Sequence, residues 1–134
     1  MAAKTTKTTL ARILTIIYVI MVLFLCLAQF SPSSSLPAKF LGFSIDKVIH
    51  FLMFLPLPIL SYLSFDHEKP GAWRMVGFVM LTFLFGAALA LGTEIAQKYL
   101  PYRTYDITDF YADCLALGVS SLLVVIVALC KKCR

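Results

Sequence analysis

Charged residues are scarce in this sequence. They make up 14% of its 134 residues, whereas a typical soluble domain carries about 25%, and the mean hydropathy is +0.89. A soluble core would show amphipathic faces with charges every few residues, so this composition argues against an ordinary soluble protein. The length has room for one domain.

The sequence also lacks the local signatures of several common chemistries. It has no serine nucleophile elbow, no phosphate-binding P-loop and no zinc-ligand spacing. Its four cysteines do not make a disulfide framework, because Cys26 and Cys114 lie inside apolar runs. Cys130 and Cys133 form a C-K-K-C motif, and a single motif of this kind is weak support for a metal or redox site.

Long apolar runs are abundant instead. Four of them, each 18 to 21 residues long, occupy residues 13–30, 48–65, 73–93 and 110–130. At about 1.5 Å of helical rise per residue, each run crosses a hydrocarbon layer of about 30 Å. We therefore predict an all-α polytopic membrane protein with one domain, residues 1–134, and four transmembrane helices at about 12–30, 46–65, 73–99 and 107–130. No A-x-A cleavage site follows the first run, so we interpret it as an uncleaved helix.

The basic residues are unevenly distributed among the segments that flank these runs. Eight of the twelve lie before the first run, between the second and third, or after the fourth: Lys4, Lys7, Arg12, Lys69, Arg74, Lys131, Lys132 and Arg134. The other four lie in the first and third connections: Lys39, Lys47, Lys98 and Arg103. By the positive-inside rule, this asymmetry places both termini and the middle connection in the cytoplasm. Membrane topology thus explains the net charge of +5, and we expect no nucleic-acid partner.

A short polar stretch, residues 94–113, separates the third and fourth apolar runs. It holds four of the seven acidic residues of the chain: Glu94, Asp106, Asp109 and Asp113. In the predicted topology the first and third connections both lie on the extracytoplasmic face, which brings Asp46, His50 and Arg103 to the same end of the bundle. We predict that these residues converge on one polar site. The opposite end has no comparable cluster in the sequence.

The third and fourth helices carry matching stripes. In each stripe the polar residues lie toward the stretch 94–113, and the small residues lie further along the helix, away from it. On the third helix the stripe is Ala87, Ala90, Glu94 and Gln97. On the fourth it is Asp109, Asp113, Ala116 and Ser120. Residues at spacings of three and four share one helix face, and small residues let membrane helices approach closely. We therefore predict that the two stripes face each other.

Some of the acidic residues have a simple structural explanation. Asp106 would cap the fourth helix, and Asp109 in its first turn would be favoured by the helix dipole. Asp113 lies about 6 Å deeper by helical rise, which is too far in for a cap. Glu94 lies near a helix C-terminus, where the dipole disfavours an anion. It therefore needs a metal, a proton or a cationic partner, for example a salt bridge with Arg103.

The predicted second helix has two further features. Pro56 and Pro58 each remove a backbone donor, which predicts a kink near Leu55. His50 lies one helical turn after Asp46, so the two share a face and the carboxylate would orient the imidazole.

Three chemistries fit this set of residues, and the sequence leaves all three open. The carboxylates and the histidine would bind a divalent cation, with oxygen-rich ligation suiting Mg²⁺, Ca²⁺ or Mn²⁺ better than zinc. A carboxylate and His50 would also serve as general base and general acid. Arg103, a planar fork of donors, would hold a phosphate or carboxylate group of a ligand.

The pattern resembles that of the VanZ-like family of small bacterial membrane proteins. The segment D-K-V-I-H-F supplies Asp46, Lys47 and His50. The segment E-I-A-Q-K-Y-L-P-Y-R-T-Y-D-I-T-D supplies Glu94, Gln97, Arg103 and Asp109. The four-helix layout is similar too, so the resemblance covers most of the chain from about residue 13. The family usually has Asn where this chain has Asp113 and Gly where it has Ala116.

The resemblance implies a multi-pass protein of the bacterial inner membrane that acts in the cell envelope. Because the name-giving member is linked to resistance to the glycopeptide antibiotic teicoplanin, the expected ligand is a polyprenyl phosphate, a lipid-linked glycan or another peptidoglycan precursor. The residues expected to contact it are Asp46, Lys47, Gln97, Arg103 and Asp106. Those expected to act as acid–base groups or metal ligands are Glu94, His50, Asp109 and Asp113.

Two functions from other classes stay open at this point. One is a small proton- or cation-coupled carrier in which Glu94 and Asp113 titrate. The other is a non-catalytic membrane partner protein, whose polar cluster only holds the helices together.

Overall fold

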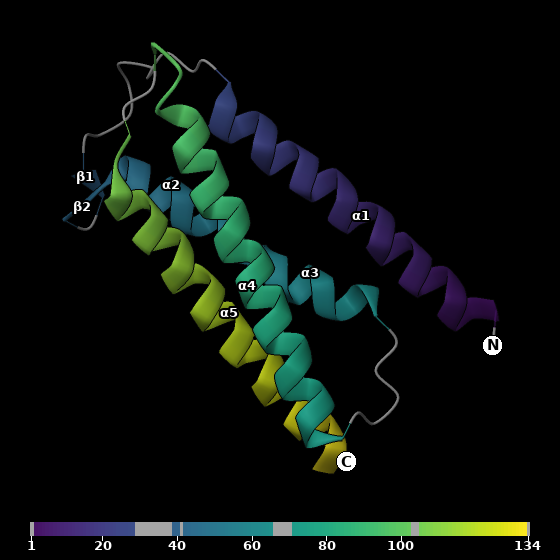
Figure 1. The fold of residues 1–134 in the computed structure, drawn as a ribbon. Coiled ribbons are helices and arrows are strands. Elements are labelled where there is room, and N and C mark those ends of the chain that lie inside the picture. Colours follow the sequence, from purple (N-terminus) through teal and green to yellow (C-terminus); the bar gives the residue numbers. More distant parts are fainter. Residues whose placement is uncertain (1, 29–38, 41, 66–70, 103–104, 134) are drawn as a thin grey trace.

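The computed structural model describes residues 2–28, 39–40, 42–65, 71–102 and 105–133. Within them the chain forms five helices and one short hairpin (Figure 1). In chain order these are α1 (Ala2–Leu27), β1 (Lys39–Phe40), β2 (Phe43–Ser44), α2 (Ile45–Phe54), α3 (Pro56–Ser64), α4 (Ala72–Gln97) and α5 (Ile107–Cys133). The start of α1 and the end of α5 lie at the same end of the bundle, as Figure 1 shows.

Four segments of the described chain are long and apolar enough to cross a membrane. They are Thr6–Leu27, Ile45–Ser64, Ala72–Gln97 and Ile107–Cys130. Large apolar side chains cover their outer surfaces; Leu81, for example, is 71% exposed and Phe24 is 65% exposed. A surface of this kind is stable in lipid, because hydrocarbon tails surround the side chains instead of water. The prediction of an all-α multi-pass membrane protein with four spanning segments is confirmed.

The second spanning segment is divided into α2 and α3 at Leu55, where the two prolines predict a kink. Leu55 keeps helical dihedral angles (φ −57°, ψ −42°), and its N–H donates to the carbonyl oxygen of Phe51 at 3.1 Å. Pro56 then occupies the first position of α3, where a missing N–H is tolerated best. The helix is interrupted at this point because the prolines cannot complete the backbone hydrogen-bond ladder.

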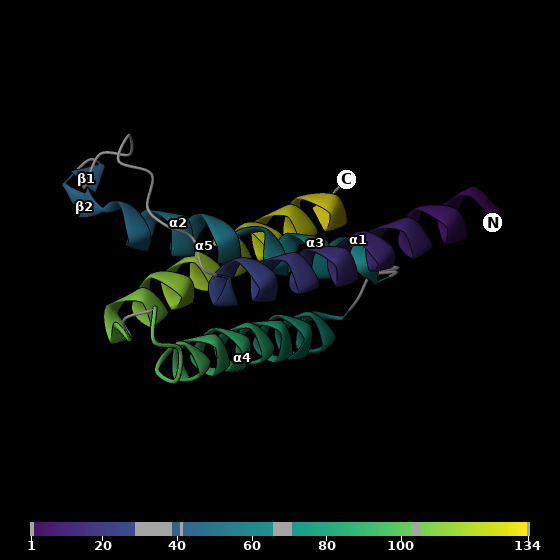
Figure 2. The ribbon, with the colours of Figure 1, turned by 90° about the horizontal axis from the view of Figure 1, so that it is seen from above.

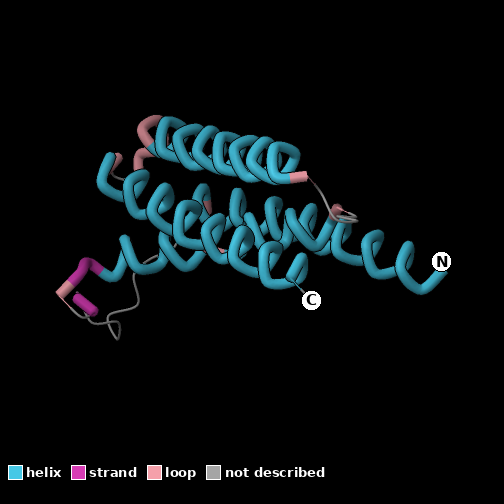
Figure 3. Tube along the Cα trace, turned by 90° about the horizontal axis from the view of Figure 1, so that it is seen from below, coloured by secondary structure: helices cyan, strands magenta, loops and turns pink. Residues whose placement is uncertain are grey.

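A two-stranded antiparallel hairpin precedes α2, with Lys39 opposite Ser44 and Phe40 opposite Phe43. Gly42 has a φ of +86°, a region that residues with a side chain rarely adopt. The sequence does not predict this hairpin, because two strands of two residues each give no periodic pattern. Figures 2 and 3 place the hairpin beside the start of α2, on the opposite side of the bundle from α4.

α5 is the central helix of the packing, since it contacts α2, α3 and α4, while α1 packs on α3 and α4. The main core lies around Phe54, Leu57, Ala90, Ala116 and Leu117, all of them at most 1% exposed. Ala90 and Ala116 come from the two small-residue stripes, so the prediction that these stripes face each other is confirmed. The close approach of α4 to α5 brings their polar residues together as well.

A second polar contact joins α1 and α3. The Nε of Arg12 donates to the carbonyl oxygen of Ser64 at 2.9 Å, and the hydroxyl groups of Thr15 and Ser64 lie 2.7 Å apart. The Ser64 hydroxyl also donates to the carbonyl oxygen of Leu60 at 2.7 Å. These bonds satisfy polar groups between two helices. They do not form a cluster of ionisable side chains like the one predicted at the other end.

Candidate functional site

Three helices supply the predicted site residues at one end of the bundle. α2 carries Asp46, Lys47 and His50; α4 carries Glu94 and Gln97; and α5 carries Asp109 and Asp113, with Asp106 just before its first residue. Their convergence follows from the contacts of α5 with both α2 and α4. Arg103, which the sequence places in the same site, lies outside the described residues, so its predicted salt bridge with Glu94 and its role as an anion holder stay predictions.

The innermost part of the site is formed by His50, Glu94 and Asp113, here called the inner triad. Nδ1 of His50 lies 3.3 Å from both oxygens of Asp113 and 3.8 Å from Oε1 of Glu94. His50 is 4% exposed, and the two acids are completely buried. The sequence favours Asp46 as the residue that orients the imidazole, whereas the hydrogen bond of Nδ1 is made with Asp113. The rotation of α5 against α2 decides this, and a helical spacing within α2 cannot reveal it.

Both oxygens of Glu94 and Oδ1 of Asp113 have no hydrogen-bond partner within the described chain. A buried ionised carboxylate without a partner is costly, and within a membrane such a group is a functional candidate. The packing therefore holds two carboxylates and one imidazole close together, with acceptor atoms still free to bind a cation or a proton.

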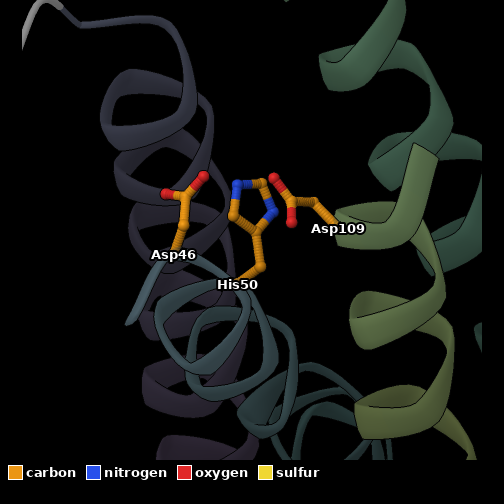
Figure 4. A group of neighbouring side chains, drawn as sticks. All are labelled: Asp46, His50 and Asp109. Carbon is orange, nitrogen blue, oxygen red and sulfur yellow. The ribbon is translucent and has the colours of Figure 1, made fainter. Parts of the chain in front are cut away.

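A second group, Asp46, His50 and Asp109, lies on the outer side of the same imidazole. The ligand atoms of the three residues are all within 4.8 Å of one another. Figure 4 shows the imidazole between the two carboxylates, with one ring nitrogen facing Asp46. Asp109 is buried at 2% exposure, and Asp46 is exposed. Asp46 thus lies at the entrance of the site, and His50 belongs to both groups.

Lys47 neutralises part of this negative charge. Its Nζ donates to Oδ2 of Asp106 at 2.9 Å and to Oδ1 of Asp109 at 3.4 Å. The lysine is thereby paired with two carboxylates inside the protein. Its predicted contact with an anionic head group stays a prediction, and such a contact would compete with these two bonds.

Asp106 has the capping role that the sequence offers as its simple explanation. Its Oδ1 accepts hydrogen bonds from the backbone N–H of Thr108 at 2.9 Å and from the Thr108 hydroxyl at 2.6 Å. These bonds, together with the ion pair to Lys47, hold the pKa of the Asp106 carboxyl well below its usual range. Asp106 therefore fixes the start of α5, the helix that positions Asp109 and Asp113.

Gln97 and Tyr18 connect the site to α1. The amide Nε2 of Gln97, which is 2% exposed, donates to the carbonyl oxygen of Cys26 at 2.9 Å. Gln97 thus anchors the end of α4, and its predicted contact with a ligand stays untested. Tyr18 is missed by the sequence reasoning: its side chain packs against the main core, and its hydroxyl is buried without a hydrogen-bond partner in the described chain. A lone hydroxyl within an apolar run is the signal that would have found it.

Comparison with known proteins identifies the family to which the chain belongs. The model of the VanZ/LLP1 family matches residues 7–128, a range that contains every residue of the site. An uncharacterized protein of Schizosaccharomyces pombe is 30% identical over 107 residues, which are 80% of this chain and 59% of the yeast protein. The chain thus spans about three fifths of that relative's length. No solved structure matches. With a family model that covers four spanning segments and the polar site between them, the chain belongs to the VanZ-like family.

Proposed function

We propose that this membrane protein binds the phosphate-bearing head group of a membrane lipid at the end of the bundle that holds the polar site. The observation that carries the proposal is the depth of the inner triad. Glu94 lies three residues from the end of α4, His50 five residues after the start of α2, and Asp113 six after the start of α5. Helical rise puts them about 4.5, 7.5 and 9 Å from those helix ends.

Glu94 lies at the boundary between lipid head groups and hydrocarbon, and His50 and Asp113 lie within the outer edge of the hydrocarbon. α4 has 26 residues and is therefore about 39 Å long, whereas the hydrocarbon layer is about 30 Å thick. A centred α4 thus extends about 4.5 Å past the hydrocarbon at each end, which is the depth of Glu94, whereas the 20 residues Ile45–Ser64 are about 30 Å long and just span it. An acid–base or metal-binding group at this level can reach a phosphate but not the centre of the bilayer.

The other half of the bundle supports a head-group ligand over a transported ion. Below the site, Phe54, Leu57 and Leu117 are at most 1% exposed and close the space between the helices. The buried polar residues described beyond them, Ser64, Thr82, Ser120 and Ser121, carry no charge. A proton or cation carrier would need groups that continue the path across the membrane.

Within this class, a polyprenyl phosphate or a lipid-linked glycan is the ligand that we favour. The site then lies on the extracytoplasmic face, and in a bacterium the protein resides in the inner membrane. A link to teicoplanin resistance would follow where the lipid carries a peptidoglycan precursor.

The experiment compares lipid binding by the wild type, His50→Gln and His67→Gln, the last being the same change in the middle connection. Each protein is purified in mild detergent, its co-purified lipids are identified by mass spectrometry, and binding of a polyprenyl phosphate is titrated in nanodiscs. We expect the wild type and His67→Gln to retain the lipid, and His50→Gln to lose most of it.

Two results would contradict the proposal. The first is a wild type that retains no phosphate-bearing lipid above the level of an unrelated membrane protein. The second is proton flux in reconstituted vesicles, followed with an internal pH dye, that disappears in Glu94→Gln; this result would establish the carrier.

A further inference from the structure

We propose that His50, Glu94 and Asp113 form a binding site for one divalent transition-metal cation, Mn²⁺ or Zn²⁺. The inference deepens the proposed function and rests on it only for the role of the cation, which is to hold the lipid phosphate. The site itself rests on the geometry of the inner triad.

The separations within the triad are close to those of ligands around a single ion. Ligand atoms about 2.1 Å from an ion lie about 3.0 Å apart at octahedral angles and about 3.4 Å apart at tetrahedral angles. Nδ1 of His50 lies 3.3 Å from the Asp113 oxygens and 3.8 Å from Oε1 of Glu94. All three ligand atoms are within 4.8 Å of one another. Small side-chain shifts would complete the coordination.

Glu94 is the independent observation that points to a ligand. It is completely buried, its Oε1 lies 3.8 Å from Nδ1 of His50, and neither of its oxygens makes a hydrogen bond of good geometry in the described chain, although the backbone N–H of Asp106 lies toward the carboxylate. Asp113 has one such oxygen, Oδ1. Two negative charges held inside a membrane bundle are costly unless they are compensated. A divalent cation supplies the two positive charges that compensate them.

The outer group gives His50 the arrangement expected of a metal ligand. A histidine that binds a metal through one ring nitrogen usually donates its other N–H to a carboxylate or a carbonyl group. Nδ1 points to the inner triad, and Figure 4 shows a ring nitrogen facing the carboxylate of Asp46. Asp46 would therefore orient the imidazole from the entrance of the site.

The ligand types narrow the choice of ion. One imidazole and two carboxylates make a mixed nitrogen and oxygen set, which suits Mn²⁺ and Zn²⁺, whereas Mg²⁺ and Ca²⁺ prefer oxygen ligands. Three protein ligands also leave coordination positions free for water or a phosphate oxygen. Lys47 is already paired with Asp106 and Asp109, so it does not offset the charge of the inner triad. The carboxylates of the triad would therefore repel a phosphate, and a bound cation would allow the phosphate to approach.

The test measures the metal alone, in detergent and without added lipid. Four proteins are first stripped of metal with a chelator: the wild type, Glu94→Gln, Asp113→Asn and the matched control Glu68→Gln. Each is then titrated with Mn²⁺, and electron paramagnetic resonance measures the bound ion. Binding of Zn²⁺ is measured separately by elemental analysis after dialysis. We expect about one ion per wild-type chain. Glu94→Gln and Asp113→Asn should bind at least about tenfold more weakly, since even loss of a residue that supports a ligand costs about 10- to 100-fold.

Thermal unfolding shows whether each variant is folded and reports binding independently. Removal of a buried charge should leave Glu94→Gln at least as stable as the metal-free wild type. Added Mn²⁺ or Zn²⁺ should raise the Tm of the wild type and Glu68→Gln only, because an ion that binds the folded state stabilises it. Failure of both ions to bind or to raise the wild-type Tm overturns the site, as does equal binding by Glu94→Gln. Metal binding without lipid binding would overturn the proposed function alone.

Discussion

Asp106 and Asp113 are seven residues apart in one segment, yet their environments differ completely. The side chain of Asp106 is 44% exposed and caps α5, whereas Asp113 is fully buried beside His50. Helical rise alone separates the two, since it carries Asp113 away from the helix end and into the bundle. One aspartate thus caps a helix, and the other is part of the buried site.

The Asp106 carboxyl has two structural roles that substitutions can separate. Asp106→Ser keeps an oxygen that accepts the N–H of Thr108 but loses the charge facing Lys47, and Asp106→Ala loses both. We expect the Tm at pH 7 to fall from wild type to Asp106→Ser and again to Asp106→Ala. Thermal unfolding in detergent measures both steps.

The pH dependence of these two differences in Tm shows which of them is due to the negative charge of Asp106. The folded-state pKa of Asp106 is lowered relative to an unfolded value of about 3.9. Its charge therefore stabilises the fold fully above about pH 5, and this contribution is lost progressively over the pH range below about 4. The difference between wild type and Asp106→Ser should shrink over that range, while the difference between Asp106→Ser and Asp106→Ala stays constant. A pH-independent first step would exclude the ionised carboxylate as its cause.

At the scale of helices, α4 and α5 approach each other closely because Gly86 has no side chain. A Cβ at this position would lie 2.6 Å and 2.9 Å from the two methyl carbons of Leu117 and 3.2 Å from a methyl carbon of Leu57. Leu117 is completely buried and Leu57 is 1% exposed, so both side chains would have to rearrange within the core. The glycine thus sets the helix spacing on which the contact between the polar stripes depends.

We expect Gly86→Ala to lower the free energy of unfolding by about 1–3 kcal/mol, the usual cost of overpacking a tight core. Gly92→Ala in the same helix is the matched control, because a Cβ there meets nothing within 4 Å, and it should be neutral or slightly stabilising. Unfolding in mixed micelles with a denaturing detergent measures both variants. Equal stability of the two variants would show that the spacing of α4 and α5 adapts to the added methyl group.

The sequence predicts those parts of the fold that periodicity and helix length determine. Apolar length predicts the four spanning segments, proline chemistry predicts the break at Leu55, and the spacing of Ala90 and Ala116 predicts which faces of α4 and α5 meet. The partners of single side chains depend on the rotation and depth of neighbouring helices, which no local pattern encodes. For this reason the pairing of Lys47 with two aspartates and the hydrogen bond of Gln97 to α1 appear only in the structure.

For the whole molecule, the distribution of basic residues predicts which end faces the cytoplasm. Cys130 is exposed near the end of α5, and Tyr105, which is 46% exposed, lies at the end that holds the polar site. We expect a membrane-impermeant maleimide to label Tyr105→Cys in intact cells when Cys130 and Cys133 are replaced by Ser. The unmodified chain should be labelled at Cys130 only after the membrane is permeabilised.

The opposite labelling pattern would place the polar site on the cytoplasmic side. The inner triad would then face the cytoplasmic pool of lipid-linked precursors, and the extracytoplasmic orientation would be wrong. The metal-site test would be unaffected, because it is performed on protein in detergent.

The break at Leu55 has a mechanical consequence for the site. α2 is only ten residues long, about 15 Å, and it carries Asp46, Lys47 and His50 as one rigid group. Leu55 separates it from α3, which packs on α1 and α5, while α2 itself packs mainly on α5. Because the three side chains lie on one short helix, the angle of that helix at Leu55 sets their positions together. The distances between His50 and the carboxylates of α4 and α5 therefore depend on this one angle.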